Sequence, residues 1–353
     1  MKGLELLEKL SNLHGAPGFE DDVIEFMSHN TSYESNRDSI NNLYLSKKNS
    51  HSEKPVVALD CHSDEVGFIV EGINRNGTIS FLPLGGWHVA NIPAHAVKIK
   101  NSKGEYIDGV VASKPPHFMT QEEMNRLPKL NELTIDIGTS SYKETVELYS
   151  IEVGNPITPD VTFKFDSKTQ VMRGKAFDNR LGCGAVLEIL EDVKDEELEV
   201  NVKGIVTAQE ESGLRGAQVA GNKIKPDFII IFEGSPADDT FKDEFSSKGA
   251  MGKGIQLRVV DSGMISNSRV LNFVKNIAKE NNIPYQLIAR SGGSTNGARY
   301  HTSGEGIPCI VIGMATRYIH THYTFASLKD YNDAVLLGKK ILEGLNKEIL
   351  KNF

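Results

Sequence analysis

Thr207-Ala208-Gln209-Glu210-Glu211-Ser212-Gly213 is the stretch on which the interpretation of this chain depends, because it places two adjacent carboxylates directly after a strand-like run at 198–206. Two carboxylates at the end of a buried strand lose hydration and repel each other. A metal ion, a shared proton or a basic partner can stabilise them, and a catalytic metal site can use one as a ligand and its neighbour as a proton carrier. A solvent-exposed acidic turn is the alternative, and the pair alone does not decide between the two.

The composition is that of a globular protein with room for more than one domain. A length of 353 residues predicts two domains or one domain with an insertion. A net charge of −8 argues against a nucleic-acid partner and against an anionic membrane surface. The cysteines at 61, 183 and 309 are far apart in apolar or glycine-rich surroundings, which predicts reduced, buried thiols. With no signal-peptide pattern and no apolar run near the ~20 residues that span a bilayer, we expect a cytoplasmic protein.

Apolar runs and helical periodicity alternate over most of the chain. Buried-strand patterns occur at 55–61, 198–208, 226–233 and 307–313. Helical spacing occurs at 3–13, after the acidic residues 20–22, at 181–193, at 268–281 and after a cap at Ser327. This alternation predicts an α/β fold, with a mixed, mostly parallel sheet flanked by helices.

The region 66–164 has a different texture. Short β-rich runs at 67–72, 77–82, 96–100, 109–112 and 133–137 are separated by turn signals, and a threonine-capped short helix begins at Thr120. We expect this region to be a small β-barrel or sandwich inserted into a main domain made of residues 1–65 and 165–353. Its one tryptophan, Trp87, belongs either to the core or to a binding surface.

Five potential metal ligands follow the ends of predicted strands or lie at strand-to-helix turns. Open α/β sheets build their sites at such positions. Two imidazoles and three carboxylates suit Zn²⁺, Co²⁺ or Mn²⁺. The five are His62, Asp178, Glu211, Glu233 and His320.

Each of these residues also has a purely structural interpretation. His62 alone could be a core histidine, and Asp178 or Asn179 could cap the helix that follows. Taken together, five ligands exceed the three of one open catalytic zinc, but they suit two metals that share one carboxylate and hold a water between them. Glu210 would then be the general base, and Asp64 would fix the tautomer of His62.

Several longer runs resemble the glutamyl and tetrahedral (TET) aminopeptidases, which are two-metal peptidases of clan MH. The resemblance covers nearly the whole chain in order. Within the inserted region, residues 111–117 and 133–138 also resemble the family. The runs that carry it in the main domain are His62-Ser-Asp-Glu-Val-Gly-Phe, Lys175-Ala-Phe-Asp-Asn-Arg-Leu-Gly-Cys, Ala208-Gln-Glu-Glu-Ser-Gly-Leu-Arg-Gly-Ala and Arg317-Tyr-Ile-His.

The resemblance implies a zinc-peptidase-type fold and an aminopeptidase that removes N-terminal residues from short peptides with two divalent metals per subunit. It implies that one metal binds His62 and Glu211, that the other binds Glu233 and His320, and that Asp178 bridges them before a cis peptide. It further implies self-association through the inserted domain into hollow particles, often dodecamers, that admit only peptides.

Two departures from the family pattern concern the site. Glu233 stands where many members have aspartate, and Gly293-Ser-Thr-Asn296 stands where many read Gly-Gly-Thr-Asp. In that loop Arg290, Gly293 and Asn296 are candidate substrate contacts. An acidic substrate residue would need a basic pocket, for which the candidates are Arg258, Arg290 and Arg299.

Other functions stay open at this point. The same metals could serve a deacylase of N-acyl amino acids. A glycanase is less favoured, because it usually places two carboxylates directly on the sugar in an aromatic groove, whereas this chain has one tryptophan. A non-catalytic assembly protein is disfavoured by the complete ligand set together with Glu210.

Overall fold

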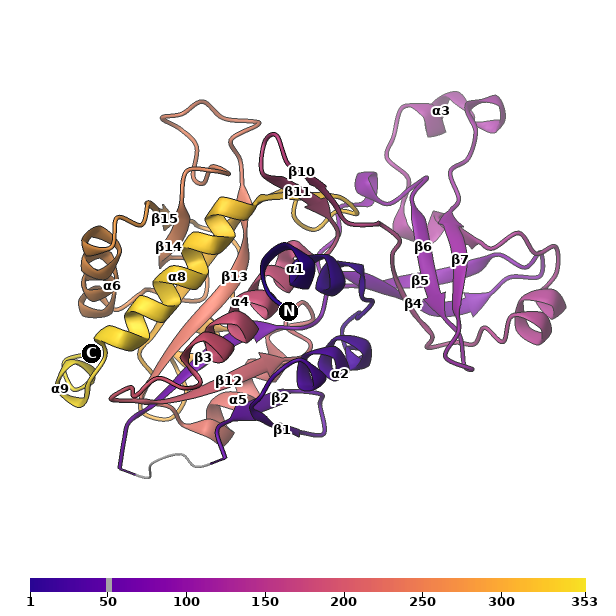
Figure 1. Ribbon diagram of the computed structural model, residues 1–353. Coiled ribbons are helices and arrows are strands. Elements are labelled where there is room, and N and C mark those ends of the chain that lie inside the picture. Colours follow the sequence, from indigo (N-terminus) through magenta and orange to yellow (C-terminus); the bar gives the residue numbers. More distant parts are fainter. Residues whose placement is uncertain (49–52) are drawn as a thin grey trace.

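The computed structural model describes residues 1–48 and 53–353, and over these residues it contains a mixed sheet with helices on both faces and a separate barrel (Figure 1). The α/β fold with a small barrel is therefore confirmed. In the sheet, β12, β3, β13 and β16 run parallel, as do β14 and β15, and the other pairings are antiparallel. In sheet order the strands are β1 (Glu34–Arg37), β2 (Leu43–Ser46), β12 (Asn201–Thr207), β3 (Val56–His62), β13 (Phe228–Ala237), β16 (Cys309–Arg317), β17 (Thr324–Ser327), β11 (Val171–Gly174) and β10 (Lys164–Asp166). Off this path, β14 (Ile255–Val260) pairs with β16, and β15 (Tyr285–Ala289) pairs with β14.

Strand β13 explains why the sheet needs helices on both faces. Phe228, Ile230 and Phe232 join the core cluster on one face, and Ile229 and Ile231 join the cluster on the other. All five are fully buried, and burying such a side chain contributes roughly 1.5–3 kcal/mol. The first face is covered by α1 (Gly3–Asn12), α2 (Asp21–His29), α4 (Phe177–Val193), α6 (Ser268–Glu280) and α8 (Leu328–Gly344), and the second by α5 (Arg215–Ile224) and α7 (Gly297–Tyr300).

Helix caps confirm two local predictions and settle a third. The Ser327 hydroxyl accepts the Asp330 amide at 3.4 Å to open α8, and Thr120 forms a capping box with Glu123 at α3 (Gln121–Met124). At the start of α4, Asn179 Oδ1 accepts the Gly182 amide at 2.9 Å. Asn179 is therefore the capping residue, which leaves the Asp178 carboxylate free for other contacts.

The second unit is a closed barrel with the strand order β4-β5-β8-β7-β6-β9 (Figure 1). Its core is a cluster of its own, which includes Phe68, Ile79 and Val97. The sixth strand, β9, is bounded by two prolines and was not among the predicted β-rich runs. The bounds are β4 (Gly67–Ile73), β5 (Ile79–Leu84), β6 (Ala96–Lys100), β7 (Tyr106–Val111), β8 (Ile135–Asp136) and β9 (Pro156–Pro159).

Short helical turns complete the described chain. They are η1 (Val89–Asn91), η2 (Pro116–Phe118), η3 (Leu130–Glu132), η4 (Glu144–Leu148) and α9 (Lys347–Leu350). Within the described residues, no helix combines the length and apolar character needed to cross a membrane.

Parallel pairing aligns the strand ends that carry the candidate ligands. His62, the last residue of β3, pairs with Thr207, the last residue of β12. On the other side β3 pairs with β13, which carries Glu233. The carboxyl ends of β12 and β3 therefore lie side by side, where α/β sheets place their sites. The expectation that Glu233 follows a strand end is wrong, because β13 continues past it to Ala237 and Glu233 reaches the site from inside the strand.

Candidate metal centre

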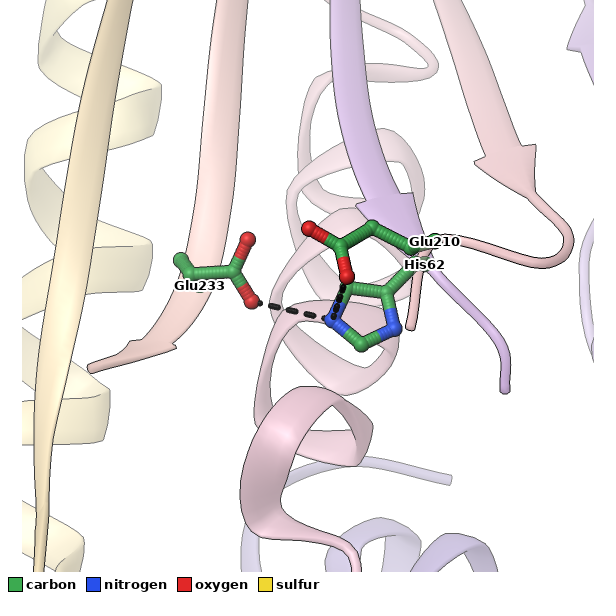
Figure 2. Close-up of side chains that lie close together, drawn as sticks. All are labelled: His62, Glu210 and Glu233. Carbon is green, nitrogen blue, oxygen red and sulfur yellow. Dashed lines mark hydrogen bonds and ion pairs between the residues drawn. The ribbon is translucent and has the colours of Figure 1, made fainter. Parts of the chain in front are cut away.

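His62 is the centre of one half of the site. Its Nε2 lies 2.9 Å from Asp178 Oδ1 and 3.1 Å from Glu233 Oε1, and Glu210 Oε2 lies 4.0 Å away. Figure 2 shows Glu233 of β13 and Glu210 of the turn after β12 converging on this nitrogen. The other ring nitrogen, Nδ1, lies 3.1 Å from the main-chain oxygen of Asp64. A proton on Nδ1 would satisfy that oxygen and leave Nε2 as the ligand atom.

His320 is the centre of the other half. Its Nε2 lies 3.4 Å from Asp178 Oδ2 and 3.4 Å from Glu211 Oε2, and its Nδ1 lies 2.9 Å from the carbonyl oxygen of Gly86. Asp178 therefore presents one carboxylate oxygen to each histidine. The peptide bond that follows it, Asp178–Asn179, is cis, as the family resemblance implied.

These contacts differ from the expected division of the ligands. The resemblance paired His62 with Glu211 and His320 with Glu233. The short contacts instead join His62 to Glu233 and His320 to Glu211. Ligand atoms of His62, Asp178 and Glu211 also fall within 4.8 Å of one another, so the two halves form one continuous cluster.

Burial perturbs the glutamate carboxyl groups of this cluster more strongly than the neighbouring histidines can offset. Burial raises the pKa of Glu211 and that of Glu233 to about 8, and it raises the pKa of Glu210 well above its ordinary value. Burial also opposes ionisation of Asp178, but hydrogen bonds from both histidines outweigh it and hold the pKa of that carboxyl below its ordinary value. Perturbed pKa values in a cleft are typical of functional sites.

The donors present fit metal ions. Among the described residues, Glu211 Oε1 and Glu233 Oε2 are buried side-chain oxygens without a hydrogen-bond partner, although such oxygens normally have one. Both belong to carboxylates that already face a histidine, as a metal ligand would. Four clustered carboxylates, those of Asp178, Glu210, Glu211 and Glu233, would also be balanced in charge by two divalent ions.

Asp64 contributes to the site differently from the expectation. Its carboxylate oxygen lies 3.5 Å from His62 Nδ1, farther than its main-chain oxygen. The two carboxylate oxygens instead accept the main-chain amides of Glu210 and Glu211, each at 3.0 Å. Asp64 therefore ties the histidine at the end of β3 to the acidic turn after β12.

A cavity of about 760 Å³ opens over these ligands. Arg258, Arg290, Arg299 and Gly293 line it together with the acidic cluster. Arg258 is buried and paired with Asp261 at 2.9 Å. The ion pairs found among the described residues include neither Arg290 nor Arg299. Their hydrogen bonds go to neutral oxygens.

Asn296 is not part of the cavity wall. It is fully buried, and its Nδ2 donates to Asp60 Oδ2 at 2.8 Å and to Thr207 Oγ1 at 2.7 Å. This position removes it from the candidate substrate contacts and makes it an anchor of the loop.

Gly86 is a site residue that no sequence motif indicates. Its carbonyl oxygen accepts a hydrogen bond from His320 Nδ1 across 234 positions, and no local signal could have indicated that contact. Trp87 stacks on Phe68 of the barrel at 4.7 Å between ring centroids.

Known proteins are similar to this chain over most of its length. The family model for M42 glutamyl aminopeptidase matches residues 41–337. The chain is 32% identical to FrvX of Escherichia coli (strain K12) over 99% of this chain and 98% of that protein. It is 31% identical to the glutamyl aminopeptidase of Lactococcus lactis subsp. cremoris (strain MG1363), over 98% of each.

Solved structures are similar over the whole fold. The TET aminopeptidase from the marine sediment archaeon Thaumarchaeota archaeon SCGC AB-539-E09 matches with a TM-score of 0.92 and 34% identity, over 99% of this chain and 98% of that one. The TET1 peptidase of Pyrococcus horikoshii, which can assemble into a tetrahedron or a large octahedral shell, matches with a TM-score of 0.87 and 25% identity, over 97% of this chain and 99% of that one.

Proposed function

The chain belongs to the M42 glutamyl aminopeptidase family, and from that premise we propose that it is a two-metal aminopeptidase that removes N-terminal residues from short peptides. The observation that carries the proposal is Asp178, whose two oxygens face His62 and His320 separately. A carboxylate placed in this way is suited to bridge two ions. Glu211 Oε1 and Glu233 Oε2, which have no hydrogen-bond partner, support these two glutamates as one further ligand for each ion.

In the proposed centre, His62 and Glu233 would hold one ion, His320 and Glu211 would hold the other, and Asp178 would serve both. The ligand set of imidazole and carboxylate suits Zn²⁺, Co²⁺ or Mn²⁺. When bound, such ions polarise a carbonyl and lower the pKa of an attacking water toward ~7.

Glu210 is the proposed proton carrier. Its Oε2 lies 4.0 Å from His62 Nε2, beside the ligands. Burial and the neighbouring charges of Glu233 and Glu211 raise its pKa, so that it can hold a proton near neutral pH. It would take the proton of the attacking water on a carboxylate oxygen and deliver it to the leaving amine, a role worth ~10²–10⁴-fold in rate.

The opposed charges of the cavity suggest how a peptide is oriented. We propose that the free α-amino group lies toward the acidic cluster and that the side chain of the N-terminal residue lies toward Arg258, Arg290 and Arg299. The guanidinium groups of Arg290 and Arg299 can bind a carboxylate without first breaking an ion pair. We therefore expect a preference for N-terminal glutamate or aspartate.

We also propose self-association through the barrel. Its strands and loops expose large apolar side chains, which on soluble proteins often mark contact surfaces. Those of Leu82, Val110, Phe118, Met124 and Leu127 are between 47% and 73% exposed. The assembly of the P. horikoshii relative supports a large particle, and light scattering of the purified chain tests it.

A panel of aminoacyl-p-nitroanilides tests the activity itself. We expect release of p-nitroaniline that is abolished by a chelator and restored by Zn²⁺, Co²⁺ or Mn²⁺. N-acyl amino acids and soluble cellulose complete the panel. Activity that survives exhaustive chelation would refute the metal mechanism, and a preference for the N-acyl substrates would favour a deacylase.

A further inference from the structure

The turn that carries Glu210 and Glu211 is held by side chains from distant parts of the chain. Every main-chain amide from Ala208 to Glu211 donates to a fully buried side chain. Asn42 Oδ1 accepts from Ala208 at 2.9 Å, Glu20 Oε1 accepts from Gln209 at 3.1 Å, and Asp64 accepts from Glu210 and Glu211. Four consecutive amides at the end of a strand thus have acceptors that no regular secondary structure supplies.

The carbonyl groups of the same turn are fixed as well. The oxygens of Ala208, Gln209 and Glu210 accept amides from 213–216, at distances between 2.8 and 3.3 Å. In each peptide bond from Ala208 to Glu211, both the carbonyl oxygen and the amide are therefore hydrogen-bonded. We call the three acceptors Glu20, Asn42 and Asp64 the amide cradle.

Gln209 shows why the turn needs the cradle. Its φ is 55°, in the left-handed region that a residue with a side chain rarely adopts. After this reversal Glu210 points toward His62, and Glu211 points toward His320. A relaxed Gln209 would turn both carboxylates away from their partners.

Glu20 does not serve the helix that it precedes. It is the N-cap residue of α2, yet its side chain makes no cap hydrogen bond there. Oε1 instead accepts from Gly18 at 2.7 Å and from Gln209, and Oε2 accepts from Asn41 at 3.1 Å. A buried carboxylate with these contacts is a support for the turn rather than for α2.

We infer that Glu20 and Asn42 are positioning residues for catalysis: they hold the Glu210–Glu211 turn in its left-handed form from the N-terminal part of the chain. They act through Gln209 and Ala208 and contact neither substrate nor metal. This inference rests on the proposed function for its kinetic consequence, although the effect on the turn is independent of it.

Hydrogen exchange of the metal-free protein tests the structural part. Glu20→Ala should speed exchange of the amides of Gln209–Glu211 more than tenfold, while Glu20→Gln, which keeps Oε1, should leave their exchange near that of the unmodified chain. Glu188→Ala is the matched control. It removes another buried carboxylate, one that accepts from Tyr331 at 2.7 Å and does not touch the turn. Equal exchange in the two alanine variants would overturn the inference.

Kinetics test the consequence. At saturating metal, Glu20→Ala should lower kcat ~10–100-fold, as loss of a supporting partner typically does, and Glu20→Gln should restore most of the rate. A kcat of Glu20→Ala equal to that of Glu188→Ala would refute the positioning role. An unmodified enzyme that is inactive or insensitive to chelator would instead refute the proposed function, and the exchange result would still stand.

If Glu20→Ala does not fold, Asn42→Ala takes its place, because it removes the acceptor of the neighbouring amide. The same local rise in exchange and the same fall in kcat are expected. Exchange at 208–211 equal to that of the Glu188→Ala control would then overturn the inference.

Discussion

Replacement of Arg290 by methionine should weaken hydrolysis of substrates with N-terminal glutamate and spare those with N-terminal leucine. Arg290 lines the cavity, and its hydrogen bonds go to the oxygens of Pro236, Lys248 and Gln256. Burial and the charge of Arg258 lower its pKa to about 10, so it stays charged at neutral pH.

The size of the effect follows from this environment. Two unit charges 4 Å apart attract by ~4 kcal/mol at an effective dielectric constant of ~20. Desolvation of the substrate carboxylate offsets part of that, and hydrogen bonds to charged groups contribute a net ~1.5–3 kcal/mol. Loss of this contribution corresponds to a roughly 10- to 150-fold fall in kcat/KM.

The assay compares kcat/KM for glutamyl- and leucyl-p-nitroanilide. Arg269→Met is the matched control, because Arg269 is exposed on α6 and is not part of the cavity wall. We expect the glutamyl-to-leucyl ratio to fall in Arg290→Met and to stay constant in the control. A ratio unchanged in both Arg290→Met and Arg299→Met would refute the basic-pocket reasoning.

Two further predictions concern the metals. Between pH 6.5 and 8 the folded, metal-free protein keeps protons on Glu211 and Glu233, whose pKa values are about 8, whereas the unfolded chain has lost them near 4.5. The native state therefore binds more protons than the unfolded state, so the free energy of unfolding should fall as the pH rises through this window. At saturating metal this dependence on pH should disappear. Chemical denaturation at several pH values checks both results, and a free energy of unfolding that rises with pH would contradict the prediction. Gly86→Ala should weaken metal binding at His320 ~10-fold, because the added Cβ would lie 3.0 Å from His320 Nδ1. Metal titration checks this against Gly292→Ala, whose Cβ would meet nothing within 4 Å, and equal affinities would disprove it.

The sequence alone predicts those parts of the site that depend on local pattern. The buried run before Glu233 and the strand that ends at His62 are recognisable because both faces of each strand are apolar. The caps at Thr120 and Ser327 are recognisable because a cap is a short-range hydrogen bond. Such signals place His62 correctly at the end of β3, but they end the strand of Glu233 too early, because β13 runs on to Ala237. They do not say how the ligands pair.

The pairing of ligands depends on strand order. Strand β3 lies between β12 and β13, so His62 can reach either Glu211 or Glu233, and their order along the chain does not choose between them. The Asp178 oxygens and the short contacts support the proposed pairing of His62 with Glu233.

The remaining misses share one cause, which is contact at long sequence separation. Glu20 reads as an acidic residue that favours the start of a helix, yet its carboxylate accepts an amide 189 positions away. Asn296 reads as a candidate substrate contact in a glycine-rich loop, yet it is buried against Asp60, 236 positions away. Neither contact leaves a trace in local composition or periodicity.

The central claim is that Glu210 moves the proton in a reaction carried out beside two bound ions. The direct measurement is kcat of Glu210→Gln, with metal content determined on the same sample. Glutamine has the size of glutamate but cannot accept the proton, so kcat should fall ~10²–10⁴-fold with two ions still bound per chain. Full activity of the metal-loaded variant would contradict the account.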